Sequence, residues 1–172
     1  SAPETVAETV RLAAAAGLVG GSIEDAAGGE EPYEIALASE RIAAAAEAVR
    51  GLAVPFVLVA RAENFVRGKP TLDDTIRRLQ AYERAGADVL FAPGLPDLDS
   101  VRAVCAAVNK PVNVVGSMQN GALSVAELEA AGVKRISLAT AFYRAAMTGL
   151  HEAAREVRER GSFGFAARVM RT

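Results

Sequence analysis

The chain has 172 residues and is 51% hydrophobic but only 5% aromatic, so it can bury one core built mostly from aliphatic side chains. A formal net charge of -2 argues against nucleic acid or an anionic membrane as its partner, and the single cysteine, Cys105, excludes an internal disulfide framework. Because the chain shows neither a signal peptide nor an apolar run of roughly 20 residues, we expect a cytoplasmic protein with no membrane span.

Helical and strand patterns alternate along the chain. The predicted strands are residues 18–23, 54–60, 87–92, 111–115 and 135–139, and the predicted helices are residues 1–16, 33–50, 71–84, 97–108, 124–131 and 141–160. Three of the helices end in Ala-Gly with a strand directly after, at Gly17, Gly86 and Gly132. No hairpin signal separates the strands, so this βα array predicts a parallel sheet in a single α/β domain over residues 1–172.

Two architectures use this βα unit, a doubly wound sheet and a (β/α)8 barrel. The sequence has neither Gly-x-Gly-x-x-Gly nor Gly-x-x-x-x-Gly-Lys, the motifs of nucleotide-binding sheets. A barrel needs eight units in typically about 250 residues, whereas this chain holds five and begins on a helix. Counting units therefore leaves both architectures open.

The polar residues of most interest follow the predicted strands. The apolar run 54–60 is typical of a strand buried on both faces, and it stops at Arg61, Glu63 and Asn64. The carboxyl ends of parallel strands meet at one edge of the sheet, where ligands bind in α/β folds. The polar residues expected at this edge are Glu24, Asp25, Arg61, Glu63, Asn64, Asn113, Ser117 and Thr140.

These side chains are suited to a hard cation and a small anionic substrate. Mg²⁺ usually takes one or two protein carboxylates and keeps several waters, and the planar fork of Arg61 fits a carboxylate or a phosphate. Simpler interpretations stay open at this point. Glu24 and Asp25 could form a solvated turn, and Asn113 could be a satisfied buried amide. Arg61 could pair with Glu63 or Glu24 as a purely structural ion pair.

Five segments resemble, in the same order, the isocitrate lyase/phosphoenolpyruvate mutase superfamily. They are residues 21–25 (Gly-Ser-Ile-Glu-Asp), 60–65 (Ala-Arg-Ala-Glu-Asn-Phe), 85–91 (Ala-Gly-Ala-Asp-Val-Leu-Phe), 111–114 (Pro-Val-Asn-Val) and 132–137 (Gly-Val-Lys-Arg-Ile-Ser). The chain looks closest to the phosphoenolpyruvate mutase-like branch, also called carboxyphosphonoenolpyruvate phosphonomutase-like. This resemblance implies a (β/α)8 TIM barrel, of which the units from about strand four to strand eight are present in this chain.

The resemblance also implies roles for individual residues. Glu24 matches the glutamate of strand four that holds the metal, and Arg61 matches the arginine that binds the substrate's anionic group. Asn113 matches a polar residue of strand seven that faces the substrate, and Glu63 lies in the same motif as Arg61. We therefore expect Arg61, Glu63 and Asn113 to be catalytic and Glu24 to be the metal ligand. The expected substrate-binding residues are Arg61, Asn64, Asn113 and Ser117.

Members of the superfamily bind Mg²⁺ and a 2-oxo acid or its enolate, and they break or move an adjacent C–C or P–C bond. The resemblance thus implies an Mg²⁺-dependent lyase or phosphonomutase acting on a small 2-oxo acid or phosphonate. Phosphoenolpyruvate mutase, phosphonate hydrolase and oxaloacetate decarboxylase activities all stay open. Isocitrate lysis is not expected, because the Lys-Arg-Cys-Gly-His loop of the isocitrate and methylisocitrate lyases is missing. Glu24 and Arg61 also disfavour a phosphosugar-binding barrel.

One alternative remains, a truncated and catalytically inactive homologue that acts only as an oligomerising or binding module. The superfamily carries metal-binding aspartates on strands two and three, and those segments are not in this sequence. A barrel without its first three strands would also expose two parallel edges. In either case the resemblance implies a homo-oligomer, a dimer or a homotetramer, in which the helix at 141–160 is exchanged between subunits.

Overall fold

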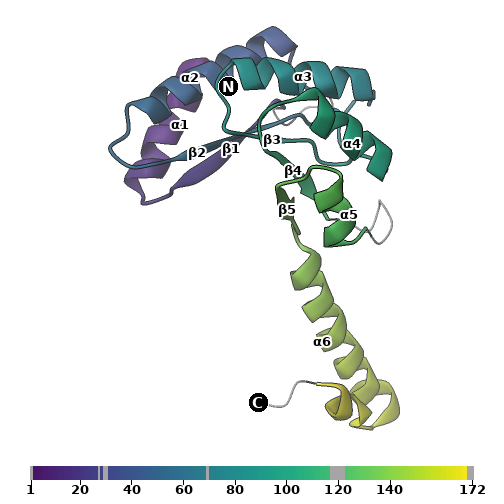
Figure 1. The fold of residues 1–172 in the computed structure, drawn as a ribbon. Helices are drawn as coiled ribbons and strands as arrows, with labels where there is room; N and C mark the ends of the chain where they lie inside the picture. Colours follow the sequence, from purple (N-terminus) through teal and green to yellow (C-terminus); the bar gives the residue numbers. More distant parts are fainter. Residues whose placement is uncertain (1, 27, 29–30, 69, 117–122, 170–172) are drawn as a thin grey trace. The chain divides into compact units, whose positions relative to one another are not determined.

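The computed structural model describes residues 2–26, 28, 31–68, 70–116 and 123–169. The chain divides into two compact units, Ser1–Ser137 and Leu138–Thr172. The strands of the first unit are β1 (Gly20–Glu24), β2 (Val57–Arg61), β3 (Val89–Phe91), β4 (Val112–Val115) and β5 (Arg135–Ser137). Its helices are α1 (Pro3–Ala15), α2 (Ile35–Arg50), α3 (Leu72–Arg84), α4 (Leu98–Ala107) and α5 (Val125–Ala130) (Figure 1). The second unit contains α6 (Ala141–Arg160) and the 3₁₀-helix η2 (Gly164–Arg168).

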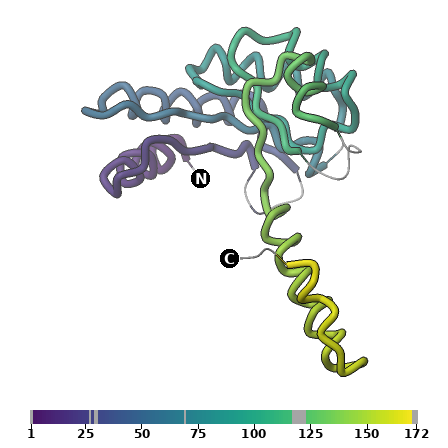
Figure 2. Tube along the Cα trace, turned by 60° about the horizontal axis from the view of Figure 1, so that its bottom comes forward, coloured from purple at the N-terminus to yellow at the C-terminus, as the bar shows by residue number. Residues whose placement is uncertain are grey.

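The five strands are parallel and lie side by side in chain order, from β1 to β5. The helices of the first unit pack on one another in the same order, α1 on α2, α2 on α3, α3 on α4 and α4 on α5. Figure 2 shows this progression as a steady change of colour through the first unit. A doubly wound sheet reverses its strand order at a switch point, whereas the strands of a (β/α)8 barrel follow the chain. The strand order therefore favours the barrel-type arrangement.

The core of the first unit lies between the sheet and the helices that follow its strands. On β2, the successive residues Leu58, Val59 and Ala60 are all buried. Successive side chains of a strand point to opposite faces, so this strand is covered on both, as predicted. The turn after α3 comes so close to α2 that a Cβ added at Gly86 would lie 2.9 Å from the Cβ of Ala46. Gly86 also has a φ of +104°, a backbone conformation that favours glycine. The Ala-Gly ending of α3 is therefore required both by backbone conformation and by helix packing.

Side-chain caps confirm three of the predicted helix starts. Thr71, Asp97 and Ser124 each accept a hydrogen bond from the backbone N–H three residues later, which satisfies an otherwise unpaired donor of the first helical turn. The second strand differs from the prediction of 54–60, since β2 begins three residues later. Pro55 has no N–H to donate to a strand ladder, so the first part of the apolar run lies before the strand.

The second unit is organised around α6, which begins and ends at the predicted residues. At its end Gly161 takes a φ of 59°, and Glu156 accepts hydrogen bonds from the Ser162 hydroxyl and the Gly164 N–H. These contacts hold η2 against α6. No residue of α6 is buried. Among the residues that the structure describes, no helix is both long and apolar enough to cross a membrane.

Candidate active site

Four neighbouring strands place Glu24, Arg61, Phe91 and Asn113 in one row. Glu24 is in register with Arg61, Arg61 with Phe91, and Phe91 with Asn113. The first three of these residues are the last of their strands. Because the strands are parallel, this row lies at the carboxyl end of the sheet, where ligands bind in barrel folds. The structure thus brings together three of the site residues predicted from the sequence, Glu24, Arg61 and Asn113.

Arg61 is the centre of this row. Its Nη1 lies 2.8 Å from Oε1 of Glu24. Its Nε and Nη2 both lie 2.7 Å from Oε1 of Glu63. The guanidinium also stacks over the ring of Phe91, 4.9 Å from the ring centroid, where a cation is attracted to the π face. The structural ion pair considered from the sequence is therefore present, and it involves both carboxylates.

The two carboxylates that hold Arg61 differ in their exposure to solvent. The side chain of Glu63 is 4% exposed, whereas that of Glu24 is 39% exposed. Burial raises the pKa of Glu63, the charge and hydrogen bond of Arg61 oppose this rise, and the negative charges of Glu24 and Asp25 add to it. A carboxyl group with a raised pKa is suited to take up and return a proton during a reaction.

Asp25 is not part of a solvated turn, because it is buried and accepts three hydrogen bonds. Its Oδ1 accepts from the backbone N–H of Glu63 at 2.8 Å. Its Oδ2 accepts from the Tyr82 hydroxyl at 2.6 Å and from Nη1 of Arg78 at 3.0 Å. One signal of this network is visible in the sequence, since Arg78 and Tyr82 are four residues apart and share a face of α3.

The same network raises the pKa of two side chains of α3. Burial raises the pKa of Tyr82, and the charge of Asp25 and the hydrogen bond to it raise it further. Burial alone would lower the pKa of Arg78, but hydrogen bonds to Asp74 and Tyr82 raise it on balance. Tyr82 is therefore held as a neutral hydrogen-bond donor and Arg78 as a cation.

The side chain of Asn64 is bound to residues at the start of α3. Its Nδ2 donates to the carbonyl of Thr71 at 3.2 Å, and its Oδ1 accepts from the Thr75 hydroxyl at 2.9 Å. Both ends of the amide are thus engaged with the residues that begin the helix. The structure places Asn64 in the predicted motif but does not bring its side chain to the row of Glu24 and Arg61.

Asn113 is buried, and its amide is hydrogen-bonded to Ser137, a residue that was not among the predicted site residues. The amide Nδ2 donates to the Ser137 hydroxyl at 3.0 Å, and that hydroxyl lies 3.1 Å from Oδ1, to which it donates. Ser137 is the last residue of β5, so the strand-end rule that found the other candidates could also have found it. The predicted substrate-binding residue Ser117 lies outside the described residues.

Glu24 is the candidate ligand for a metal at this edge. Its carboxylate is partly exposed at the end of β1. Within the described parts of the chain, no group of three or more His, Cys, Asp or Glu side chains could hold a metal ion. Mg²⁺ usually takes only one or two protein carboxylates, with waters and substrate oxygens completing its shell. One accessible carboxylate is compatible with such a site.

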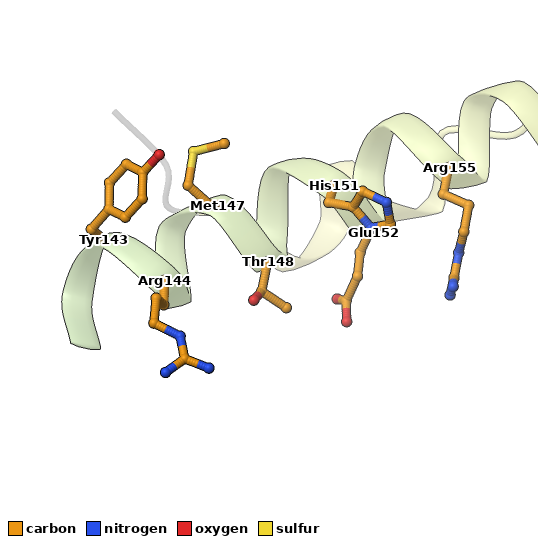
Figure 3. A pocket seen from close by; sticks show the side chains of 7 residues that line it. All are labelled: Tyr143, Arg144, Met147, Thr148, His151, Glu152 and Arg155. Carbon is orange, nitrogen blue, oxygen red and sulfur yellow. The ribbon is translucent and has the colours of Figure 1, made fainter. Parts of the chain in front are cut away.

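A separate hollow lies on α6 in the second unit. It has a volume of about 410 Å³, and Figure 3 shows the side chains that line it, all projecting from this one helix. They are Tyr143, Arg144, Met147, Thr148, His151, Glu152 and Arg155. Small-molecule sites bury most of their ligand's surface, so a hollow with a single helix as its wall does not provide that enclosure.

The chain is similar in sequence and in fold to known proteins. The family model of phosphoenolpyruvate phosphomutase matches residues 1–158. An oxaloacetate decarboxylase of Bradyrhizobium diazoefficiens is 33% identical over 159 residues, which are 90% of this chain and 54% of that protein. A crystal structure of a Burkholderia cenocepacia protein proposed to be a lyase or mutase has a TM-score of 0.94 and 53% identity, and the match covers 99% of this chain and 62% of that one.

A third similar protein has been solved with a bound ligand. The structure of an oxaloacetate acetylhydrolase in complex with its product oxalate has a TM-score of 0.83 and 26% identity, over 95% of this chain and 58% of that one. The chain thus spans 54% to 62% of the length of these three proteins. The likeness confirms the predicted α/β fold, in which five parallel strands correspond to part of a TIM barrel.

Proposed function

The chain belongs to the phosphoenolpyruvate phosphomutase family, and we propose that it forms part of a lyase or phosphonomutase-like enzyme. The superfamily indicated by the five sequence segments is thereby confirmed. The proposed reaction breaks or moves a C–C or P–C bond next to the oxo group of a small anionic substrate. Oxaloacetate has the most support, because a decarboxylase and an acetylhydrolase among the relatives are named for it. Residues 1–172 would then be one βα-repeat domain, the C-terminal part of a TIM barrel.

The observation that carries this proposal is the position of Arg61. Its guanidinium lies at the carboxyl end of β2, between the buried carboxylate of Glu63 and the more exposed carboxylate of Glu24. An arginine fork binds a carboxylate in a fixed plane through parallel hydrogen bonds. Arg61 would therefore bind the anionic group of the substrate and stabilise negative charge as the enolate develops.

Glu63 and Asn113 would assist this step in different ways. Both contacts from Arg61 fall on Oε1 of Glu63, so a proton carried by Glu63 would be held on Oε2. The raised pKa of this carboxyl supports a role in proton transfer. Asn113 is on the second strand away from Arg61 and would present a neutral amide to the substrate, its orientation fixed by Ser137.

We propose Mg²⁺ as the cofactor, with Glu24 as its ligand in this chain. The exposed carboxylate at the end of β1 suits a cation that keeps several waters. When bound, Mg²⁺ would supply Lewis-acid polarisation of the substrate's oxo group. The remaining protein ligands would come from residues outside this sequence.

Two of the predicted substrate-binding residues, Ser117 and Asn64, are proposed from their places in the sequence. Ser117 follows β4 in the sequence and is proposed from its place in the chain. Asn64 has less support, because its amide is engaged with Thr71 and Thr75 at the start of α3. Its contacts favour a role in holding the segment after β2 in place.

We also propose a homo-oligomer, a dimer or a tetramer, in which α6 packs against another copy of the chain. The helix has no buried residue and exposes Phe142, Tyr143 and Leu150. Large exposed apolar side chains that cluster on one element are typical of protein interfaces. The cytoplasmic location expected from the composition stays a prediction.

The test is a calorimetric titration of the full-length protein with oxalate, a mimic of the pyruvate enolate, with and without Mg²⁺. We expect binding that depends on the metal, and turnover of oxaloacetate. Arg61→Lys should weaken oxalate binding by about ten-fold or more, because an ammonium group keeps the charge but loses the planar fork. Arg77→Lys is the matched control, since the side chain of Arg77 is 68% exposed and pairs with its helix neighbour Asp74.

Three outcomes separate the interpretations. Metal-dependent binding that is lost in Arg61→Lys and kept in Arg77→Lys supports the proposed site. Equal binding by wild type and Arg61→Lys would remove Arg61 from it. If the full-length wild-type protein neither binds oxalate nor turns over oxaloacetate, the proposed enzymatic function is contradicted. That result would favour the alternative of an inactive, oligomerising homologue.

A further inference from the structure

The segment Arg61-Ala62-Glu63 is held at both ends by a single residue, Asp25. The strand register between β1 and β2 ends at the pair of Glu24 and Arg61. One residue further on, the backbone N–H of Asp25 donates to the carbonyl of Arg61 at 3.2 Å. The side chain of Asp25 then accepts from the N–H of Glu63 at 2.8 Å. A carboxylate thus continues the ladder where the strands themselves stop.

The other oxygen of this carboxylate is anchored to α3. It accepts from the Tyr82 hydroxyl and from Arg78, which is fixed in turn by Asp74 at 2.7 Å and by the carbonyl of Tyr33 at 2.7 Å. Asp25 is 3% exposed. A buried carboxylate with three donors in different directions has one orientation available to it. Asp25 therefore links the end of β1, the segment after β2 and helix α3.

The middle of the segment is fixed as well. Ala62 is fully buried, and its N–H donates to the carbonyl of Phe91 on β3 at 2.9 Å. The backbone between Arg61 and Glu63 is thus fixed at three successive residues. The two side chains that project from its ends meet at 2.7 Å, and their meeting depends on this backbone geometry.

We propose that Asp25 is a positioning residue, which holds the N–H of Glu63 so that Glu63 and Arg61 keep the arrangement that receives the substrate. In this role Asp25 acts through Glu63, whose N–H it holds, and not by binding the substrate itself. The expected effect of Asp25 on substrate binding rests on the function proposed above. Its expected effect on the orientation of Arg61 does not depend on that function, and the two effects can be measured separately.

The variant Asp25→Asn tests this role with almost no change in volume. The carboxylate accepts on both oxygens, whereas an amide has one acceptor oxygen and one NH₂ group. If the amide oxygen serves Arg78 and Tyr82, the NH₂ group faces the N–H of Glu63 and repels it. If the oxygen serves Glu63, the NH₂ group faces the cation of Arg78. In the variant, a hydrogen bond from the Glu63 N–H and the hydrogen bonds from Arg78 and Tyr82 cannot all be kept.

Tyr82→Phe is the matched control. It removes one donor to Oδ2 of Asp25 and leaves the bond from Glu63 to Oδ1 in place. Tyr82 is fully buried, so this variant lowers the thermal midpoint of the protein, as Asp25→Asn also does. A purely structural role for Asp25 would make the two variants alike in every other measurement.

Two readouts are made on the folded full-length protein with Mg²⁺ present. The NMR signal of the Arg61 Nε–H reports its hydrogen bond to Glu63, and calorimetry reports the affinity for oxalate. We expect Asp25→Asn to shift or broaden the Arg61 signal and to weaken oxalate binding by about ten-fold or more, since small misplacements of positioning groups have large effects. Tyr82→Phe should leave the signal in place and the affinity within about two-fold.

The outcomes separate the two proposals. An unchanged Arg61 signal in Asp25→Asn overturns the positioning role, whatever its thermal midpoint. If the wild type binds no oxalate, the proposed function fails, and the Arg61 signal still decides the role of Asp25. If Asp25→Asn does not fold, hydrogen exchange of the wild type decides instead. A Glu63 N–H that exchanges as fast as an unprotected amide would overturn the proposal, and strong protection would support it.

Discussion

Comparing a variant of Arg61 with a variant of one partner should show which of its two carboxylate contacts contributes more to stability. Arg61→Met keeps a side chain of similar length and removes the contacts to both Glu63 and Glu24. Glu63 is 4% exposed, and a buried charge that loses its partner typically costs about 3–5 kcal/mol. Arg61 is itself 24% exposed, so solvent reaches part of the site. We therefore expect the free energy of unfolding to fall by about 3 kcal/mol, at the lower end of that range.

The contact with Glu24 provides the comparison. Its side chain is 39% exposed, and exposed ion pairs contribute only about 0–1 kcal/mol. Glu24→Gln should therefore lower the free energy of unfolding by less than about 1 kcal/mol. Adding Glu63→Gln to Arg61→Met should restore part of the lost stability, because the buried group is then neutral.

The assay is urea unfolding of the wild type, the two single variants and the double variant at mildly alkaline pH, where the carboxylates are ionised. Free energies from linear extrapolation give the difference between the two contacts. The reasoning is refuted if Arg61→Met costs no more than Glu24→Gln. It is also refuted if the double variant is less stable than Arg61→Met alone, since the buried carboxylate would then not be the source of the loss.

Two further predictions concern pH and backbone conformation. The pKa of Glu63 is raised in the folded protein, so this residue contributes stability that is present below its unfolded pKa and lost as the pH rises through its folded pKa. The advantage of wild type over Glu63→Gln in free energy of unfolding should thus shrink with rising pH, and a growing advantage would contradict the shift. Gly86→Ala should cost about 1–3 kcal/mol, because φ is +104° and the new Cβ would meet Ala46 at 2.9 Å. In the control Gly149→Ala, nothing lies within 4 Å and stability should be kept or increased in thermal unfolding, whereas a loss equal to that of Gly86→Ala would contradict the steric argument.

The elements of the fold were predictable because their signals are local. Ala-Gly endings, side-chain caps and apolar runs each involve a few neighbouring residues, and α6 was found at its observed bounds from such signals. The choice between a barrel and a doubly wound sheet was not local. Both architectures use the same βα unit, and they differ in which strands become neighbours. The number of units in the sequence does not reveal which strands pair. The strand order from β1 to β5 supplied that information.

The site was predictable only in part, for the same reason. The strand-end rule placed Glu24, Arg61 and Asn113 in one row because parallel strands align their ends. It did not give the partners of Asp25, since Arg78 and Tyr82 lie 53 and 57 residues further along the chain. A residue interpreted as a possible solvated turn is therefore among the most buried polar groups of the sheet edge.

The two carboxylates that contact Arg61 differ in exposure, and this difference gives them different roles in the proposed site. Glu63 is buried and binds through two nitrogens of the guanidinium, so this contact is costly to break. Glu24 is partly exposed and binds through one nitrogen, so its contact with Arg61 can be exchanged at little cost. Under the proposed function, a substrate anion arriving from solvent would compete with Glu24 for Nη1, while Glu63 keeps the guanidinium plane in place. The residue proposed to hold the metal is thus also the one that Arg61 can most easily release.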